Sequence, residues 1–426
     1  MKKIFNFVRN KFRRLGPGFI TGAADDDPSG IATYSIAGAQ FGYQFSWLSF
    51  FLIPMMTAVQ EMCGRIGMAS GYGLAGSIKK YYSKYLLWFT ISILFVANTV
   101  NIGANLGIMA ASIQMLVGFP FFFWLIFITF FTVIMEIIIP YDKYSRYLKW
   151  MGLSLLVYGL TAVLSKQDWL QIIRSTFIPH LEFNLTYLMT LTGFLGTTIS
   201  PYLFFWQTSE EVEEEIKMGK INEFEQSPHV LLSEIKHMQK DTLAGMFFSQ
   251  LICFFIVITA ASTLHNQGIV DIETPQQVAL ALRPLAGNFS YLLFTLGIIG
   301  IGLQSVPILA GGVAYAFAES FGFKEGLAKK FTEAKAFYVT IGISTVLGAL
   351  MNLIGINAIK ALYYTAILNC LVAVPLIAII IKLADNEKVV GLHKSSNLIR
   401  NLAWMTFAFM GISSILMIYN TFIRQS

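Results

Sequence analysis

Long apolar stretches alternate with short polar connections along almost the whole chain. A helix of about 20 apolar residues is long enough to cross the hydrocarbon core of a membrane. Eleven stretches of this kind lie at 16–42, 46–70, 86–117, 119–139, 148–165, 185–209, 241–264, 288–318, 334–355, 359–383 and 402–422. Because most connections are short, residues 1–426 are predicted to form one transmembrane domain.

Two of these stretches contain helix breakers in corresponding places. The first carries Asp27-Pro28-Ser29-Gly30, and the sixth carries Gly196-Thr197-Thr198-Ile199-Ser200-Pro201. Proline removes a backbone donor, and unwound backbone at membrane depth is tolerated only against protein or a wet cavity. Breaks five helices apart are typical of the LeuT-type fold, a five-plus-five inverted repeat. We therefore expect an all-α integral membrane protein with repeats at 16–165 and 185–383 and an extra helix at 402–422.

Composition supports this class. Of the residues, 55% are hydrophobic and 13% are charged, and the mean hydropathy is +0.63. A soluble domain would carry nearly twice that charged fraction. The net charge of +6 fits cytoplasmic loops of a protein in a lipid bilayer, so no nucleic-acid partner is expected.

The distribution of lysine and arginine predicts the orientation in the plasma membrane. With a cytoplasmic N-terminus, all the basic segments fall on the same side, and eleven crossings put the C-terminus outside. These segments are 1–14, Lys79–Lys84, Lys143–Lys149, Lys324–Lys335 and Lys388–Arg400.

The first break also carries three consecutive acids, Asp25, Asp26 and Asp27. Acids within a membrane span are costly and mark a functional site by default. Asp27 lies directly at the break, where its carboxylate can combine with freed backbone carbonyls such as that of Ala24. Oxygen ligands with one negative charge suit a hard divalent cation. The alternative is that the acids only cap a helix at the membrane edge.

The sequence contains few residue patterns typical of catalysis or of cofactor binding. The cysteines Cys63, Cys253 and Cys370 form no CxxC pair, and the five histidines lie in connections or at helix ends. No HExxH motif, phosphate loop or nucleophile–base pair stands on a predicted helix. The sequence therefore predicts neither an enzyme nor a cofactor.

The segment from Gly16 to Tyr43, GPGFITGAADDDPSGIATYSIAGAQFGY, resembles the first helix of the Nramp family of divalent metal transporters. The hallmark of that family is Asp-Pro-Gly-Asn, preceded by Gly-Pro-Gly-Phe and followed by Ala-Gly-Ala-Gln-Phe-Gly-Tyr. Weaker similarities cover Gln60–Gly67 and Gly302–Gly312, in the second and eighth helices. The resemblance implies a LeuT-type fold that binds the metal, as transported substrate, between the two broken helices.

Two departures from the family pattern affect the residues expected to bind the metal. Gly30 stands where the family has asparagine, and Ser200 stands where it has methionine. A thioether favours manganese or iron over magnesium, so its loss predicts a wider, harder site suited to partly hydrated Mg²⁺. This pattern resembles the magnesium-transporting branch of Nramp-related proteins. The predicted ligands are Asp27, Ala24, Gly30, Thr197 and Ser200; the alternative is that Thr197 and Ser200 only pack near the break.

Further departures concern protons. Ile102 and Asn105 occupy the positions of acids in the family's third helix, and Tyr202 occupies that of a histidine. None of these side chains titrates near neutral pH in its ordinary state, so we expect transport that is not coupled to protons. Asn98, Asn101 and Asn105 share one helix face and either line the pathway or bond to a neighbouring helix. Asp26, Tyr202 and Asn369 are also predicted to line it.

Acids outside the first helix are expected to have structural roles. Glu210–Glu215 is expected to be a solvated helix end, with concentration of cations at the inner mouth as the alternative. Glu61 and Glu136 are expected to be interfacial or paired with basic residues such as Arg65 and Lys143.

The favoured function is therefore a Mg²⁺ and Mn²⁺ transporter. One alternative is a proton-coupled Mn²⁺ or Fe²⁺ importer, and another is an organic-solute transporter on the same fold. Against the latter, a substrate carboxylate requires a helix N-terminus free of acids. A non-transporting receptor is the remaining alternative. The sequence is compatible with a monomer but does not fix the oligomeric state.

Overall fold

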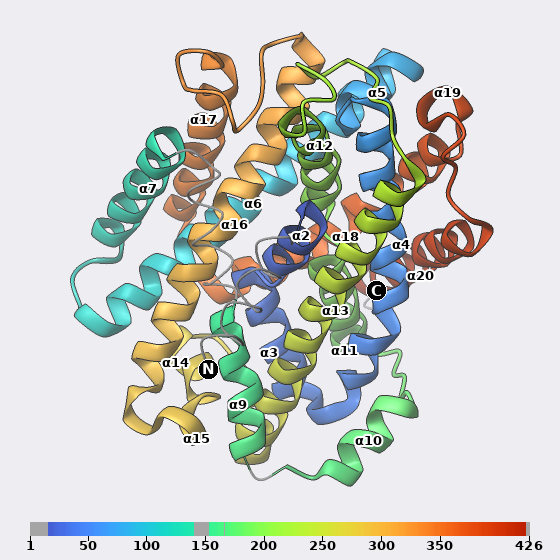
Figure 1. Ribbon diagram of the computed structural model, residues 1–426. Coiled ribbons are helices and arrows are strands. Elements are labelled where there is room, and N and C mark those ends of the chain that lie inside the picture. Colours follow the sequence, from blue (N-terminus) through green and yellow to red (C-terminus); the bar gives the residue numbers. More distant parts are fainter. Residues whose placement is uncertain (1–15, 140–152, 166, 423–426) are drawn as a thin grey trace, which may run out of the picture.

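The computed structural model describes residues 16–139, 153–165 and 167–422, and in these residues every regular element is a helix (Figure 1). The α-helices are α2 (Pro17–Asp25), α3 (Pro28–Phe41), α4 (Ser46–Ser70), α5 (Leu74–Tyr81), α6 (Lys84–Val117), α7 (Phe121–Ile138), α9 (Leu156–Leu164), α10 (Trp169–Phe177), α11 (Leu185–Thr198), α12 (Pro201–Lys217), α13 (Leu232–Thr263), α14 (Pro275–Leu280), α15 (Arg283–Ala286), α16 (Ser290–Phe321), α17 (Lys335–Met351), α18 (Ala358–Ala384), α19 (Glu387–Val390) and α20 (Asn397–Phe422).

The apolar pattern located the long helices correctly. Eight helical segments within the described residues are long and apolar enough to cross a membrane, among them α6, α7, α13 and α16. The first predicted stretch is divided into α2 and α3, and the second is α4. The fifth is represented by α9, while its first residues, 148–152, lie outside the described residues. The total of eleven crossings accordingly stays a prediction.

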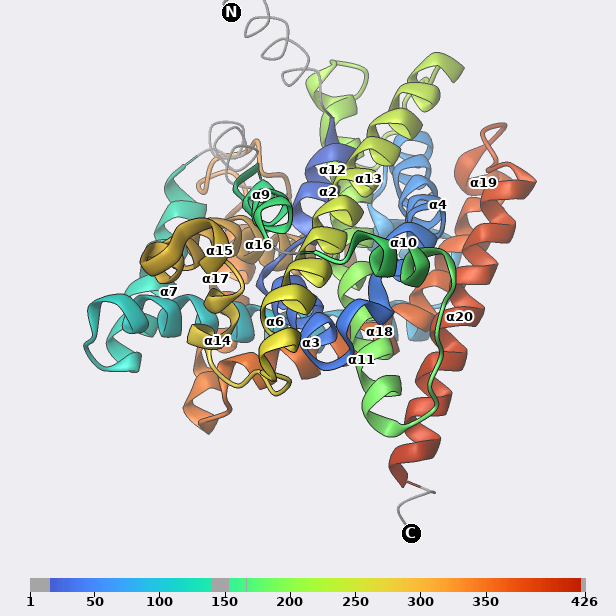
Figure 2. The same ribbon diagram turned by 90° about the horizontal axis from the view of Figure 1, so that it is seen from below.

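The two half-helices α2 and α3 lie at the centre of the molecule. Long helices surround them, with α7 and α20 on opposite edges in both views (Figures 1 and 2). The short helices α5 and α19 lie at one end, and α10, α14 and α15 lie at the other. The break between α2 and α3 therefore lies at mid-height, with the lysine-bearing α5 and α19 on one side of it.

Helix α13 packs closely against both halves of the broken first helix. A Cβ atom added to Gly18 or Gly22 would overlap with the backbone of Thr242 or Gly245, and one added to Gly38 would overlap with that of Val257. Small residues allow helices in a membrane to approach to backbone contact. Small residues thus fix α2 and α3 to the same neighbouring helix.

The amino-terminal end of α2 is also capped by α13. The backbone N–H groups of Gly16 and Phe19 donate to the two carboxylate oxygens of Asp241, at 2.9 and 3.0 Å. The first N–H groups of a helix have no partner within the helix, and a carboxylate there is further favoured by the helix dipole. Asp241 therefore anchors α2 at the end farthest from the break.

Candidate metal site at the two broken helices

Both breaks leave a short extended segment between two helices. At the first, α2 ends at Asp25 and α3 begins at Pro28, with Asp26 at φ −80° and ψ 57°. At the second, α11 ends at Thr198 and α12 begins at Pro201, with Ile199 at φ −119° and ψ 72°. Proline at the first position of each new helix has no N–H to leave unpaired. Each break ends one helix with carbonyls that have no partner in the next turn.

Asp27 is buried and forms the centre of a polar network at the first break. Its Oδ1 accepts hydrogen bonds from the Ser29 hydroxyl at 2.5 Å and from the Gly30 N–H at 3.0 Å. Its Oδ2 accepts one from the Asn105 amide of α6 at 3.1 Å. Asp27 thus caps α3, in line with the alternative that the acids cap a helix. It does so in the buried interior, however, and not at a membrane edge.

A hydroxyl pair connects the two breaks. The Oγ of Ser29 and the Oγ1 of Thr197 lie 3.0 Å apart. The Tyr202 phenol, in the first turn of α12, donates to the Ala24 carbonyl at 3.2 Å. The predicted residues Asp27, Ala24, Thr197 and Tyr202 are therefore brought together although the two segments are far apart in sequence.

Gly30 and Ser200 make more limited contributions. A Cβ on Gly30 would lie 3.6 Å from both the Asp25 carbonyl oxygen and the Thr197 Oγ1, so a larger side chain there would face the same group of oxygens. The Ser200 hydroxyl lies within donating distance of the carbonyls of Gly196 and Thr197, at 3.0 and 2.9 Å. Ser200 thus lies against carbonyls at the end of α11.

The predicted pathway residues divide into two groups. Asn105 belongs to the network, because its amide also donates to the Ser305 hydroxyl of α16 at 3.3 Å. Asn98 instead bonds to α16 through the Leu309 carbonyl, at 2.9 Å, as the alternative interpretation of the asparagine face held. Asn101 and Asn369 are buried, and the Asn101 amide and the Asn369 Nδ2 have no hydrogen-bond partner among the described residues. Asp26 faces α13, where the Ser249 hydroxyl lies 3.4 Å from its Oδ1.

Three serines of the polar network were not among the predicted site residues. Ser29 lies within the motif at the first break, and its hydroxyl beside an intramembrane aspartate could have predicted it as a site residue. Ser305 lies in the segment Gly302–Gly312 that resembles the family, but nothing in that segment marks its hydroxyl, and Ser249 lies in a long apolar helix with no local mark of function. They become visible only when Asn105 and the acids are seen to contact them.

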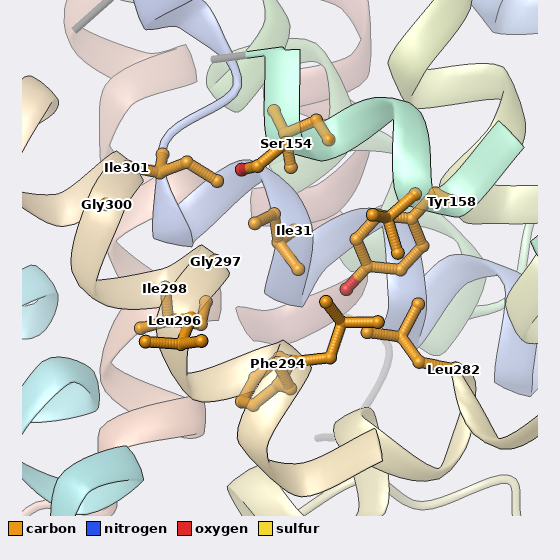
Figure 3. Close-up of a pocket in the computed structure, with 13 residues that line it drawn as sticks. Ile31, Ser154, Tyr158, Leu282, Phe294, Leu296, Gly297, Ile298, Gly300 and Ile301 are labelled. Carbon is orange, nitrogen blue, oxygen red and sulfur yellow. The ribbon is translucent and has the colours of Figure 1, made fainter. Parts of the chain in front are cut away.

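A cavity of about 280 Å³ lies beside the break but is lined by none of the predicted ligands (Figure 3). Ile31 of α3, Tyr158 of α9 and Phe294 of α16 border it. The remaining lining residues are Ser154, Leu155, Val157, Leu282, Leu293, Leu296, Gly297, Ile298, Gly300 and Ile301. Walls that are almost entirely apolar offer a cation no replacement for its water ligands.

The acidic run at the end of α12 is not a solvated helix end, so that expectation was wrong. Glu210, Glu211, Glu213 and Glu215 are buried. Glu213 accepts hydrogen bonds from the Tyr315 phenol at 3.0 Å and the Leu327 N–H at 2.9 Å, among other contacts of the run. Neighbouring elements supply these donors to Glu213, which composition alone does not reveal.

The remaining two acids differ from each other. Glu61 pairs with Arg65 one helical turn away, as expected. Glu136 is buried, and neither of its carboxylate oxygens has a partner among the described residues. Its expected partner Lys143 lies outside the described residues.

The site offers oxygen ligands with little positive charge. The ion pairs of the described residues include none with Asp25, Asp26 or Asp27. Within the same residues, no group of three or more His, Cys, Asp or Glu side chains is arranged to hold a metal. A single carboxylate with hydroxyl, amide and carbonyl oxygens suits a hard cation that keeps part of its water shell.

Two broken helices around a polar, buried centre define a multi-pass membrane transporter of the LeuT type. A family model described as "Natural resistance-associated macrophage protein-like" matches residues 18–420, so the chain belongs to the Nramp family. This family consists of transporters, which confirms that the protein is not an enzyme and that the metal is cargo and not a cofactor.

Individual relatives agree with this assignment. The chain is 26% identical over 345 residues to the "Divalent metal cation transporter MntH" of Deinococcus radiodurans, covering 78% of this chain and 76% of that protein. It is 23% identical over 432 residues to the protein of the same name in Listeria welshimeri, covering 97% of this chain and 91% of that protein.

Solved structures confirm the predicted fold. The manganese transporter of Eremococcus coleocola, in complex with an aromatic bis-isothiourea substituted compound, superposes with a TM-score of 0.77 at 15% identity, over 97% of this chain and 87% of that chain. MHP1, a nucleobase-cation-symport-1 family transporter, superposes with a TM-score of 0.62 at 12% identity, over 96% of this chain and 91% of that chain.

Proposed function

We propose that this protein transports Mg²⁺ and Mn²⁺ as partly hydrated ions, without coupling to protons, through a site formed by Asp27, Ala24, Gly30, Thr197 and Ser200. The observation that carries the proposal is the group of hard oxygen atoms connecting the two breaks, from Asp27 through Ser29 to Thr197. None of these atoms is a sulfur. Mg²⁺ is bound by oxygen and releases its waters reluctantly, and Gly30, which has no side chain, leaves space for them.

The absence of proton coupling rests on the neighbours of Asp27. Asn105 donates to the carboxylate through a carboxamide, which does not titrate. Tyr202 donates to the Ala24 carbonyl, in the position of a histidine in typical family members. Of the predicted pathway residues, Asn105 and Tyr202 serve as neutral polar groups beside the ion.

A proton-coupled Mn²⁺ or Fe²⁺ importer is the second candidate. The names of the relatives favour manganese as cargo, since one is a divalent metal cation transporter and another a manganese transporter. Ser200 favours the first candidate, because a hydroxyl has no preference for the softer ions. An organic-solute transporter is disfavoured by the three acids at the break.

Flux through purified protein in proteoliposomes tests the proposal. Uptake of Mg²⁺, Mn²⁺ and Ca²⁺ is measured together with a luminal pH dye. We expect Mg²⁺ and Mn²⁺ uptake without acidification, and loss of uptake in Asp27→Ala. Ser200→Met should raise the preference for Mn²⁺ over Mg²⁺. Luminal acidification that tracks metal uptake would overturn the uncoupled mechanism, and unchanged selectivity in Ser200→Met would overturn the argument from ligand softness.

We further propose that the protein resides in the plasma membrane with its N-terminus in the cytoplasm and its C-terminus outside, and that 16–165 and 185–383 are its two repeats. The ends of the molecule offer a test, because Asn266 and Leu392 are both exposed. Asn266 follows the seventh predicted crossing and is therefore expected outside, whereas Leu392 lies in the basic segment Lys388–Arg400, which is expected in the cytoplasm. A membrane-impermeant thiol reagent added to intact cells should label Asn266→Cys and spare Leu392→Cys. The reverse pattern would invert the proposed orientation.

A further inference from the structure

The apolar cavity beside the first break contains one polar group that the proposed ion path does not use. Tyr158 of α9 is 4% exposed, and its phenol oxygen has no hydrogen-bond partner among the described residues. Figure 3 shows this oxygen directed into the cavity, towards the space between Ile31 and Phe294. A buried hydroxyl without a partner is costly, so this phenol requires an explanation.

The position of Tyr158 is fixed by a contact with α13. The Thr259 hydroxyl of α13 donates to the Tyr158 carbonyl at 3.1 Å, which ties this turn of α9 to its neighbour. Close packing around a buried ring also restricts its rotamers. A donor whose orientation is set before binding loses little conformational entropy when it meets a ligand. The phenol is therefore a preorganised donor at the wall of the cavity.

The cavity walls disfavour water as the partner of this donor. Apart from Tyr158 and Ser154, every described residue that lines the cavity has an apolar side chain or none. Figure 3 shows Ile31 between the Ser154 oxygen and the Tyr158 oxygen, so the two hydroxyls do not face each other. A buried water needs two to four polar partners, whereas an apolar cavity of about 150 Å³ takes up benzene. The larger volume here, about 280 Å³, therefore suits a compact organic molecule.

Charge and shape narrow the class of ligand. None of the described lining residues carries a charge, which favours an uncharged ligand. The rings of Tyr158 and Phe294 both border the cavity, and aromatic rings pack favourably against one another. We propose that the cavity binds a compact, uncharged aromatic molecule and that a carbonyl oxygen of this molecule accepts a hydrogen bond from the Tyr158 phenol. The inference is independent of which ion is transported, because no predicted metal ligand lines the cavity.

The bilayer supplies the route by which such a molecule enters. Leu296 of α16 lines the cavity and is 60% exposed, within a helical segment apolar enough to cross a membrane. On α9, which forms another wall, Leu160 and Val163 are exposed as well. Lipid tails are as apolar as these side chains, so the exposed faces of both helices lie against lipid. An uncharged aromatic molecule dissolved in the hydrocarbon core reaches the cavity between α9 and α16.

Binding of two fluorinated probes to the purified full-length protein tests the proposal. Fluoroacetophenone carries a carbonyl oxygen, and its isopropyl analogue, fluorocumene, has nearly the same shape without an acceptor. Fluorine NMR measures the affinity of each probe, with protein-free micelles as the reference for partitioning. We expect saturable binding of both, with fluoroacetophenone about fivefold tighter, as one net hydrogen bond predicts. Absence of saturable binding would overturn the proposal. Equal affinities would assign the cavity to plain hydrocarbon, such as a lipid chain, and would overturn it too.

Three variants locate the probe in the cavity. Tyr158→Phe keeps the ring and removes only the hydroxyl, so it should bind the two probes equally. The matched control is Tyr364→Phe on α18, at a tyrosine that is 55% exposed, and it should keep the fivefold preference. Gly297→Leu extends a side chain into the cavity and should weaken both probes at least tenfold. A preference that survives in Tyr158→Phe, or wild-type affinities in Gly297→Leu, would contradict the assignment.

Mg²⁺ separates this cavity from the metal site. Saturating Mg²⁺ should leave the affinity for fluoroacetophenone unchanged, because none of the predicted metal ligands borders the cavity. Asp27→Ala should lose Mg²⁺ uptake and still bind the probe as the wild type does. Displacement of the probe by Mg²⁺ would place it in the metal site and overturn the proposal.

Discussion

At the scale of single residues, the contact between Ser29 and Thr197 is the direct connection between the two breaks. The two hydroxyls are 168 positions apart in sequence and 3.0 Å apart in space. Ser29 also donates to Asp27, so Thr197 acts on the carboxylate through one intervening hydroxyl. A change at Thr197 should therefore reach the ion even if Thr197 is not itself a ligand.

Replacing Thr197 by valine keeps the shape of the side chain and removes the hydroxyl. A net hydrogen bond is worth about 1 kcal/mol, so we expect the KM for Mg²⁺ to rise about fivefold. The matched control is Thr208→Val on α12, because the Thr208 hydroxyl donates to the Phe204 carbonyl of its own helix, about two turns beyond the break. Equal KM values in the two variants would show that the contact between the breaks contributes nothing to ion binding.

The sequence predicted some of these residues and not others, for a physical reason. Asp27 could be predicted from its immediate neighbours, because an acid before proline in an apolar helix has few structural uses. Ser249 and Ser305 act only through partners on other helices, and no local pattern marks such contacts. The burial of Glu213 was missed for the same reason, since its donors Tyr315 and Leu327 are about a hundred residues away.

At the scale of helices, α2 and α13 pack closely because glycine residues, which have no side chain, lie at their contact. Gly22 meets the backbone of Gly245, whereas a Cβ on Gly297 of α16 would find no atom within 4 Å. The two glycines therefore differ in the space around them.

Gly22→Leu should therefore force α2 away from α13, whereas Gly297→Leu should only extend into the apolar cavity. We expect Gly22→Leu to lower the thermal unfolding temperature in detergent and to abolish Mg²⁺ uptake, since overpacking costs about 1–3 kcal/mol or more. Gly297→Leu should retain both, because the cavity is not on the proposed ion path. Loss of uptake in Gly297→Leu at normal stability would place the cavity on that path.

Hydropathy predicted the long helices and both breaks, because a membrane span requires an apolar length and proline interrupts it. It did not reveal α5, α10, α14, α15 and α19, which are too short to give a span signal. Their positions depend on contacts with the ends of the long helices, which the pattern along the chain does not record.

At the scale of the whole molecule, acids gather near the end at which α12 and α16 finish. Burial, together with the neighbouring carboxylates of Glu319 and Glu213, raises the pKa of Glu325 well above its usual range. Glu325 lies in the connection between α16 and α17, outside the spans. Its folded pKa exceeds its unfolded pKa, so the stability that it contributes is present at low pH and lost as the pH rises through the folded value.

Glu325→Gln has no charge to bury at any pH. We expect its thermal unfolding temperature to equal that of the wild type at about pH 5 and to exceed it increasingly towards about pH 8. Glu223→Gln, an exposed glutamate in the connection after α12, serves as the control and should follow the wild type. A constant difference across the pH range would show that Glu325 is not the group that titrates.

The double cap on α2 by Asp241 limits how that half-helix can move. With nine residues, α2 is about 13 Å long, so a tilt of about 10° about its break end shifts the other end by about 2 Å. Such a shift takes the Gly16 and Phe19 N–H groups out of hydrogen-bonding range of Asp241, while the contact of Asp25 with Ser249 scarcely changes. The half-helix can therefore tilt about its contact with Ser249 only after its hydrogen bonds to Asp241 have broken. During such a tilt the carboxyl group of Asp25, beside Ser249, scarcely moves.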